Sequence, residues 1–218
     1  GILGDGFDPE VVVDGLGRSG GYRIQHNYFK LHACCFYNHP VLDAVQALAL
    51  REGFSPSDVT HIRVEAPPQA LMMANPEPDN MLAAKFSIPY AVAAALLHGT
   101  TDITAFYPEK VTDGRVRALA QRVELVADPK MNLRRYGYPA SRVAVSLKGG
   151  RVLEESVTAH HGDTRNPASH EELTGKFSFL ALDSLREEGT RQVIAMVDRL
   201  DTLEDIGELT RLLGEGRL

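Results

Sequence analysis

Apolar residues along the chain recur with two periods, one typical of helices and the other of strands. Helical spacing predicts three helices: 40–52, 88–98 and 115–122. The first two end at Gly53 and Gly99, and Pro40 occupies a first-turn position where proline is favoured. Alternation of apolar and polar residues predicts four strands: 58–67, 123–126, 142–147 and 152–158. The Gly149-Gly150 pair between the last two strands predicts a hairpin.

The pattern changes to helix from Ser169 onward. Ser169 and Glu172, three residues later, form the sequence pattern of a capping box, which marks a helix start. Apolar residues then recur at helical spacing, and further helices are predicted over 193–200 and 203–213. Strands and helices do not alternate regularly, as they would in a parallel doubly wound sheet. The pattern therefore predicts an α+β fold with a mainly antiparallel sheet, followed by C-terminal helices.

The composition is that of an ordinary globular protein, with 44% hydrophobic and 24% charged residues in a chain of 218. A chain of this length buries enough surface to fold without a metal or disulfides. The net charge of −6 arises from 23 basic and 29 acidic residues. Because the basic residues are scattered along the chain, no nucleic-acid partner is expected. The adjacent cysteines, Cys34 and Cys35, cannot link distant segments and indicate a reducing compartment.

Two features bear on where the protein acts and on how complete the chain is. The longest apolar run, 88–97, is shorter than the roughly 20 residues that cross a bilayer, and the chain does not begin with a secretory signal. We therefore expect a cytoplasmic protein with no membrane association. Residues 1–27 are rich in glycine, lack a sustained pattern and open at Gly1 without an initiator methionine. This is typical of connecting chain and predicts a fragment or one half of a split enzyme.

One glycine-rich segment matches a known nucleotide-binding pattern. Residues 15–20 fit Gly-x-Gly-x-x-Gly and follow the apolar run 11–13. A dinucleotide site requires that the third glycine opens a helix whose N-terminus holds the pyrophosphate. Residues 21–25 have an extended pattern instead, so a plain glycine-rich loop is the favoured interpretation.

Residues 30–39 place a lysine, two cysteines and two histidines directly before the predicted helix 40–52. A structural zinc site takes four ligands, and no later cluster completes a set with these residues, so no metal site is predicted. Burial as a small apolar residue is the simpler interpretation of either cysteine alone. The position of the segment favours a further role, because Lys30 and His39 lie beside unpaired N–H groups that attract an anion.

A second predicted helix start repeats this arrangement. Ser87 is a candidate N-cap, while Lys85 and Tyr90 flank a helix end with unpaired donors. In the simpler interpretation, Ser87 only caps the helix, Lys85 is solvated and Tyr90 packs in the core. Because two helix starts each have a lysine and further donors, the sequence predicts a site for a polycarboxylate that both starts line.

Three motifs, in this order along the chain, resemble those of the MmgE/PrpD family. The motifs are Lys30-x-x-x-Cys34-Cys35-x-x-x-His39-Pro40 with Asp43-Ala44, then residues 84–93, and then Gly162-Asp163-x-x-Asn166-Pro167 with Lys176-Phe177. The resemblance extends over nearly the whole chain from about Leu16. Three motifs in the same order are far more specific than any one of them.

The resemblance implies that the chain is the C-terminal half of such an enzyme. It implies an α+β domain over 28–165 and C-terminal helices over 166–218, which belong to a larger helical domain that lies mostly before residue 1. It also implies a homodimer, a pocket between the two domains, and no metal or organic cofactor. Lys30 and Tyr90 match catalytic positions of similar enzymes. We expect four further residues to bind the substrate: Cys35, His39, Lys85 and Ser87.

The leading functional hypothesis is a cofactor-independent lyase that acts on a small di- or tricarboxylate and is similar to 2-methylcitrate dehydratase. Removal of a proton beside a carboxylate builds negative charge that Lys30 would stabilise, and Tyr90 would assist departure of the hydroxyl. The resemblance implies a histidine at the position of Cys35 in the family's cis-aconitate decarboxylase, which argues against that activity.

Two alternatives remain open at this point. The same carbanion can be reprotonated on its opposite face, which would make the enzyme an epimerase of a dicarboxylate such as iminodisuccinate. The other alternative is a non-catalytic assembly subunit of a split enzyme, because the family's upstream catalytic residues have no counterpart in these 218 residues.

Overall fold

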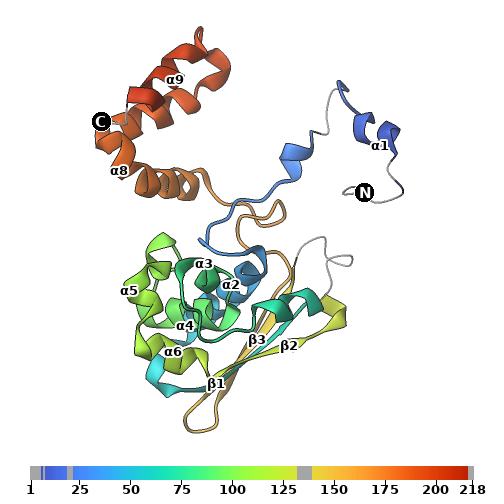
Figure 1. Ribbon diagram of the computed structural model, residues 1–218, viewed down its shortest axis with the longest axis vertical. Helices are drawn as coiled ribbons and strands as arrows, with labels where there is room; N and C mark the ends of the chain where they lie inside the picture. The colour runs from blue at the N-terminus through green and yellow to red at the C-terminus, as the bar shows by residue number, and fades with distance from the viewer. Residues whose placement is uncertain (1–5, 7, 19–21, 132–138, 216–218) are drawn as a thin grey trace.

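The computed structural model describes residue 6 and residues 8–18, 22–131 and 139–215, and it confirms the predicted α+β fold (Figure 1). A four-stranded sheet has the order β2-β1-β3-β4. Its strands are β1 (Val59–Ala66), β2 (Val123–Ala127), β3 (Ser141–Leu147) and β4 (Val152–Val157). All four strands lie within one or two residues of the predicted bounds. The sheet forms one layer of the α+β part of the chain.

The sheet is mixed rather than wholly antiparallel. β1 pairs with β3, and β3 with β4, in antiparallel fashion, whereas β1 pairs with β2 in parallel. The β3–β4 hairpin turns at Gly149 and Gly150, which both have φ of +85°, a conformation that glycine adopts without steric cost. The parallel pair requires a long crossover, and several helices between β1 and β2 form it.

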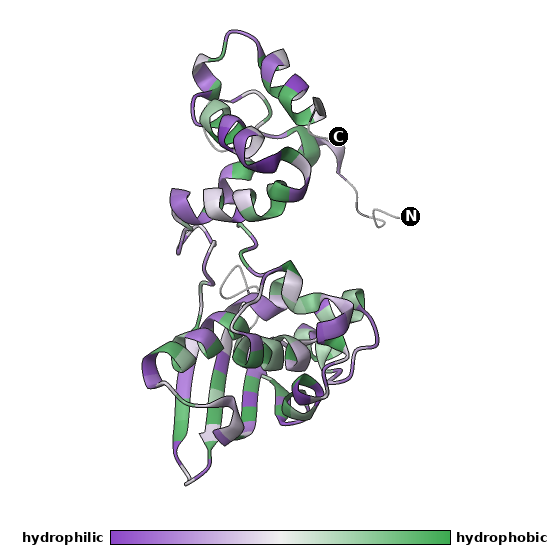
Figure 2. Ribbon diagram, turned by 90° about the vertical axis from the view of Figure 1, so that its left-hand side faces the viewer, coloured by the Kyte–Doolittle hydropathy of each residue, from purple (hydrophilic) through white to green (hydrophobic). Residues whose placement is uncertain are grey.

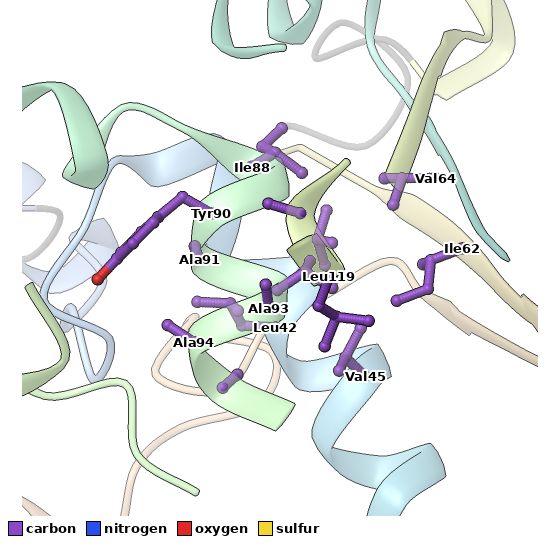
Figure 3. Close-up of a cluster of buried hydrophobic side chains, with 14 of the residues drawn as sticks. Leu42, Val45, Ile62, Val64, Ile88, Tyr90, Ala91, Ala93, Ala94 and Leu119 are labelled. Atoms are coloured by element: carbon purple, nitrogen blue, oxygen red, sulfur yellow. The ribbon is translucent and has the colours of Figure 1, made fainter. Parts of the chain in front are cut away.

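Two helices form the main helical layer against the sheet. They are α2 (His39–Glu52) and α4 (Ile88–His98), and each ends at a glycine in the left-handed conformation, as predicted. Alternate residues of β1, such as Ile62 and Val64, are fully buried. Figure 3 shows Leu42 and Val45 of α2 clustered with side chains of α4 and β1. In Figure 2, green hydrophobic residues alternate with purple hydrophilic ones along the strands, and green residues also recur along the helices that pack on the sheet.

Shorter elements complete the crossover and the connections. The short helices are α1 (Pro9–Val13), α3 (Met81–Lys85), α5 (Pro108–Val111) and α6 (Gly114–Ala120). The 3-10 turns are η1 (Arg23–His26), η2 (Phe36–Asn38), η3 (Pro56–Asp58), η4 (Pro68–Met73), η5 (Ile103–Phe106), η6 (Pro129–Met131) and η7 (Leu200–Thr202). The expectation of extended chain over 21–25 is wrong where the structure describes it, because η1 closes a turn in which Gln25 N–H donates to the Tyr22 carbonyl. Residues 19–21 lie outside the described part, so the glycine motif is only partly described.

The C-terminal part is helical, as predicted, but its boundaries differ. α8 (His170–Val197) begins at the capping box of Ser169 and Glu172, and α9 (Ile206–Glu215) follows. α8 bends at Arg186, whose φ is +52°. Figures 1 and 2 show α8 and α9 apart from the sheet layer, to which a loop over 158–169 connects them. In the part of the chain that the structure describes, no helix combines the length and apolar character needed to cross a membrane.

Candidate functional site

A cavity of about 410 Å³ lies where three segments far apart in the sequence meet. One segment precedes α2, the second is the end of α3, and the third is the first part of α8. The lining residues are Lys30, His32, Ala33, Cys34, Cys35, Phe36, Lys85, Phe86 and Lys176. The structure therefore brings Lys30, Lys85 and Cys35 of the predicted site to one cavity.

The charge of this cavity is strongly one-sided. Lys30, Lys85 and Lys176 all line it, and no carboxylate is among its described lining residues. Across the described ranges, none of these three lysines forms an ion pair with an Asp or Glu side chain. Lys85 and Lys176 are half-buried, so their charges are only partly screened by solvent. The arrangement favours a ligand with several negative charges.

Backbone hydrogen bonds hold the first two segments together. The Cys35 N–H donates to the Lys85 carbonyl oxygen at 2.9 Å, and the Asn38 side-chain amide donates to the same oxygen at 3.0 Å. The Ala33 N–H donates to the Thr101 carbonyl oxygen at 2.9 Å. The last residue of α3 is thereby fixed beside the segment that precedes α2, which explains why two distant lysines share a cavity.

A glycine sets the position of the chain that bears Lys30. The Phe29 N–H donates to the Gly162 carbonyl oxygen at 2.9 Å. Gly162 has φ of +93°, and a Cβ atom added to it would overlap the Phe29 carbonyl oxygen and lie 3.3 Å from the carbonyl carbon. Only glycine allows this approach without a shift of either backbone. Gly162 is thus a positioning residue for Lys30.

The rest of the Gly162–Pro167 motif braces this approach. The carboxylate of Asp163 is fully buried and accepts hydrogen bonds from Arg165 Nε at 3.0 Å and Nη2 at 3.1 Å. Burial raises the pKa of Asp163, but the hydrogen bonds from Arg165 outweigh burial and lower it below its usual value. The Gly162 N–H donates to the Asn166 carbonyl oxygen at 2.9 Å, which closes the turn. The motif acts here as a rigid support.

A chain of buried polar contacts begins at His32, one of the cavity-lining residues. His32 contacts Thr101 Oγ1 through Nδ1 at 2.5 Å and Asp43 Oδ1 through Nε2 at 2.8 Å. The second oxygen of Asp43 accepts a hydrogen bond from the His161 backbone N–H at 2.6 Å. Sequence reasoning assigned no role to His32 or Asp43, although Asp43 belongs to the first motif. Because both ring nitrogens of His32 are engaged, its ring orientation is fixed.

His39, a predicted substrate-binding residue, is placed inside the core instead. Its ring is fully buried and packs 5.1 Å from the rings of both His32 and His160. Burial, together with the neighbouring His32, His160 and Lys30, lowers the pKa of His39 to about 2, while the Cys34 backbone favours the charged form only slightly. The structure gives His39 no place on the cavity surface, because the first residue of α2 turns inward.

Tyr90 and Ser87 are also turned away from the cavity. Tyr90 is fully buried, its hydroxyl donates to the Ala105 carbonyl oxygen at 2.7 Å, and burial raises its pKa to about 12. Figure 3 shows Tyr90 leaving α4 on the side opposite Ile62. Ser87 Oγ accepts from the Tyr90 N–H at 3.0 Å and donates to the Asn75 carbonyl oxygen. Packing and capping, the simpler interpretation, describe both residues as the structure places them.

The two free cysteines differ in their surroundings. Cys34 is buried, and burial raises the pKa of its thiol to about 12, so it stays protonated at neutral pH. Cys35 is half-buried and more open to the cavity. Of the pair, Cys35 is therefore the side chain that a ligand in the cavity would contact more readily.

Lys176 is a cavity residue to which sequence reasoning gave no role. It lies on α8, two turns after the helix start, and its Nζ is 3.5 Å from the Leu31 carbonyl oxygen. The Lys176-Phe177 pair was part of the third motif, and the capping box placed it early in a helix. The sequence did not indicate which part of the protein the start of this helix contacts.

In the described ranges, no three His, Cys, Asp or Glu side chains are grouped so that they could hold a metal ion.

Comparison with known proteins covers most of this site. The sequence model of the MmgE/PrpD C-terminal domain matches residues 32–202, more than three quarters of the chain. Cis-aconitate decarboxylase from Mus musculus is 29% identical over 190 residues, which cover 85% of this chain and 39% of that protein. The chain thus spans about two-fifths of that relative's length. All the cavity residues except Lys30 lie inside the matched range.

Proposed function

Because this chain belongs to the MmgE/PrpD family, we propose that it is the C-terminal portion of a cofactor-independent lyase acting on a small di- or tricarboxylate. Dehydration of a 2-hydroxy acid similar to 2-methylcitrate is the leading reaction. The observation that supports this most is the cavity that Lys30 and Lys85 share, which has no carboxylate among its described lining residues.

The chemistry of dehydration calls for such a cavity. A base removes a proton from the carbon next to a carboxylate, the C–O bond to the hydroxyl breaks, and the hydroxyl leaves with a proton as water. Negative charge builds on the carboxylate as the C–H bond breaks, and fixed cations stabilise that charge more in the transition state than in the ground state. We assign this role to Lys30 and Lys85, with Cys35 in contact with the substrate.

We propose that the base comes from the part of the protein that precedes this chain. His32 is the histidine among the described lining residues of the cavity, but Thr101 and Asp43 contact both of its ring nitrogens. The ring of His39 is buried behind it. Tyr90 receives no role in this mechanism, because its hydroxyl is bound to Ala105. Its catalytic assignment stays a prediction that the geometry does not support.

The test is Lys30→Ala in the full-length enzyme. A panel of di- and tricarboxylic acids, followed by NMR in heavy water, first identifies the substrate by alkene formation. We expect Lys30→Ala to lower kcat/KM by at least 100-fold, the range for loss of a group that stabilises developing charge. Lys148→Ala, at an exposed lysine on the hairpin, is the control and should leave it unchanged. Turnover within tenfold of the wild type would remove Lys30 from the mechanism.

Decarboxylation is the second candidate, because the relative at 29% identity is a cis-aconitate decarboxylase; the cysteine at position 35, where the resemblance implies a histidine for that reaction, ranks it below dehydration. Loss of carbon dioxide leaves the same kind of carbanion, which the same lysines would stabilise. The NMR panel separates the reactions: decarboxylation removes one carboxyl carbon, dehydration forms an alkene with all carbons kept, and epimerisation exchanges a proton with inversion.

A further inference from the structure

We propose that Lys176 is a specificity-determining residue, which binds the additional carboxylate of a tricarboxylate and thereby selects it over a dicarboxylate. The inference rests on the proposed function, since it concerns the same cavity. It adds α8, a helix of the C-terminal part, to the substrate-binding surface. The sequence motifs assign no ligand to this residue.

The charge balance of the cavity supports a third anionic group. Lys30 and Lys85 suffice for the two carboxylates of a dicarboxylate, and Lys176 would then remain as an unpaired, half-buried ammonium. A charge that is partly removed from water is costly unless a partner of opposite sign compensates for it. The Leu31 carbonyl oxygen, at 3.5 Å, takes at most one of the three N–H donors of Lys176. Two donors remain for a ligand.

The nearest acidic groups have other partners. Burial raises the pKa of Asp102, but hydrogen bonds from Thr100 and Thr104 outweigh burial and lower it. The positive charge of Lys176 lowers this pKa further, which shows that the two side chains are near each other. Those two threonines occupy both oxygens of Asp102, at 2.5 to 2.8 Å. Asp43 is bound to His32 and to the His161 backbone. Neither carboxylate forms an ion pair with Lys176, so its charge is available to a ligand.

The start of α8 is anchored so that Lys176 faces the cavity. Glu172 accepts from the Ser169 N–H at 2.8 Å in the capping box and contacts His161 Nε2 at 2.7 Å. The His161 backbone is in turn bound to Asp43 on α2. Lys176 follows Glu172 by four residues and therefore lies on the same face of the helix, one turn further on. The contact that docks the helix thus also aims the lysine at the cavity.

The experiment measures selectivity between two acids that differ by one carboxylate. Propane-1,2,3-tricarboxylate and glutarate are titrated calorimetrically, in buffer without phosphate, into the full-length enzyme and its variants. We expect the wild type to bind the tricarboxylate more tightly. Lys176→Met should weaken tricarboxylate binding about tenfold, equivalent to about 1.4 kcal/mol, and change glutarate binding less than twofold. Lys176→Arg keeps the charge and should retain the selectivity, and Lys148→Met is the control at an exposed site.

The possible outcomes distinguish failure of the Lys176 proposal from failure of the proposed function. If Lys176→Met weakens both acids equally, the residue has only a structural role and the proposal is wrong. If it weakens neither, the proposal is equally wrong. If the wild type binds both acids with equal affinity, Lys176 does not select and the proposed function stands alone. If the wild type binds neither acid, the proposed function itself fails. Lys176→Gln, a second neutral variant, replaces Lys176→Met if that variant does not fold.

Discussion

Replacement of Gly162 by alanine should displace Lys30 without touching any residue of the cavity. Gly162 has φ of +93°, and its added Cβ would overlap the Phe29 carbonyl oxygen. The turn that contains Gly162 is braced by the ion pair between the buried Asp163 and the exposed Arg165. Because the turn is rigid, we expect the segment from Phe29 to Lys30 to move instead.

The magnitude follows from two separable costs. A non-glycine residue at positive φ costs roughly 1–2 kcal/mol. To restore normal contact, the two backbones must then separate by roughly 1 Å, which breaks the Phe29–Gly162 hydrogen bond at a further cost of about 0.5–1.5 kcal/mol. Gly162→Ala should therefore lower the free energy of unfolding by roughly 1.5–3.5 kcal/mol. A misplacement of about 1 Å in Lys30 should lower kcat/KM about 100-fold.

Gly150→Ala is the matched control. Gly150 also has positive φ, +85°, but a Cβ added there meets no atom within 4 Å. The control should show the conformational cost alone, with normal kcat/KM. Urea unfolding of both variants measures stability without any knowledge of the substrate, and steady-state kinetics on the full-length enzyme measures the catalytic effect. Equal stability and equal turnover in the two variants would refute the role of Gly162 as a support for Lys30.

Three further predictions concern single side chains. Tyr90→Phe should lower the free energy of unfolding by about 1 kcal/mol, because it leaves the Ala105 carbonyl oxygen without its donor. The kcat of the full-length variant should stay within threefold of the wild-type value. A 100-fold loss of kcat would restore Tyr90 to the mechanism. The pKa of His39 is lowered to about 2 in the folded protein, so stability should fall as pH drops below about 6.5, by up to about 1.4 kcal/mol per pH unit. In unfolding measured from pH 7 to 4, His39→Leu should make this slope shallower by up to about 1.4 kcal/mol per pH unit, and an unchanged slope would contradict the assignment. The pKa of His161 is raised because Glu172, by hydrogen bond and charge, outweighs burial, which lowers it. The protection factors of the first amides of α8 in hydrogen exchange should therefore be highest below about pH 6.5 and decrease as pH rises through the pKa of folded His161. Glu172→Gln should abolish this pH dependence. If the Glu172→Gln variant shows the same pH dependence as the wild type, the His161–Glu172 contact is not its cause.

The elements that the sequence predicted well are those with strong local signals. Gly53 and Gly99 end their helices as predicted, and the Gly149-Gly150 pair forms the hairpin turn. The parallel pairing of β1 with β2 could not be predicted in the same way. β2 has only five residues, and a crossover of 56 residues separates it from β1. Its partner is decided by packing of the intervening helices, which no local pattern records.

The residues of the candidate site likewise fall into those that a local signal predicts and those that only tertiary contacts place. Lys30 and Lys85 could be predicted because each lies near a helix start, and the structure brings both to one cavity. The position of Tyr90 near a helix start does not indicate which face of that helix it occupies, and its partner, Ala105, lies in a four-residue turn without a sequence signature. Lys176 reaches the cavity through contacts of α8 with segments more than 100 residues earlier, which periodicity cannot reveal.

The wide spacing of the three lysines has a consequence during protein synthesis. Lys176 leaves the ribosome 146 residues after Lys30, which at ordinary translation rates is a delay of about 7–30 s. Until α8 follows, the cavity lacks one of the three lysines that line it. A tricarboxylate can therefore meet all three lysines of the cavity only after the first turns of α8 have emerged and docked.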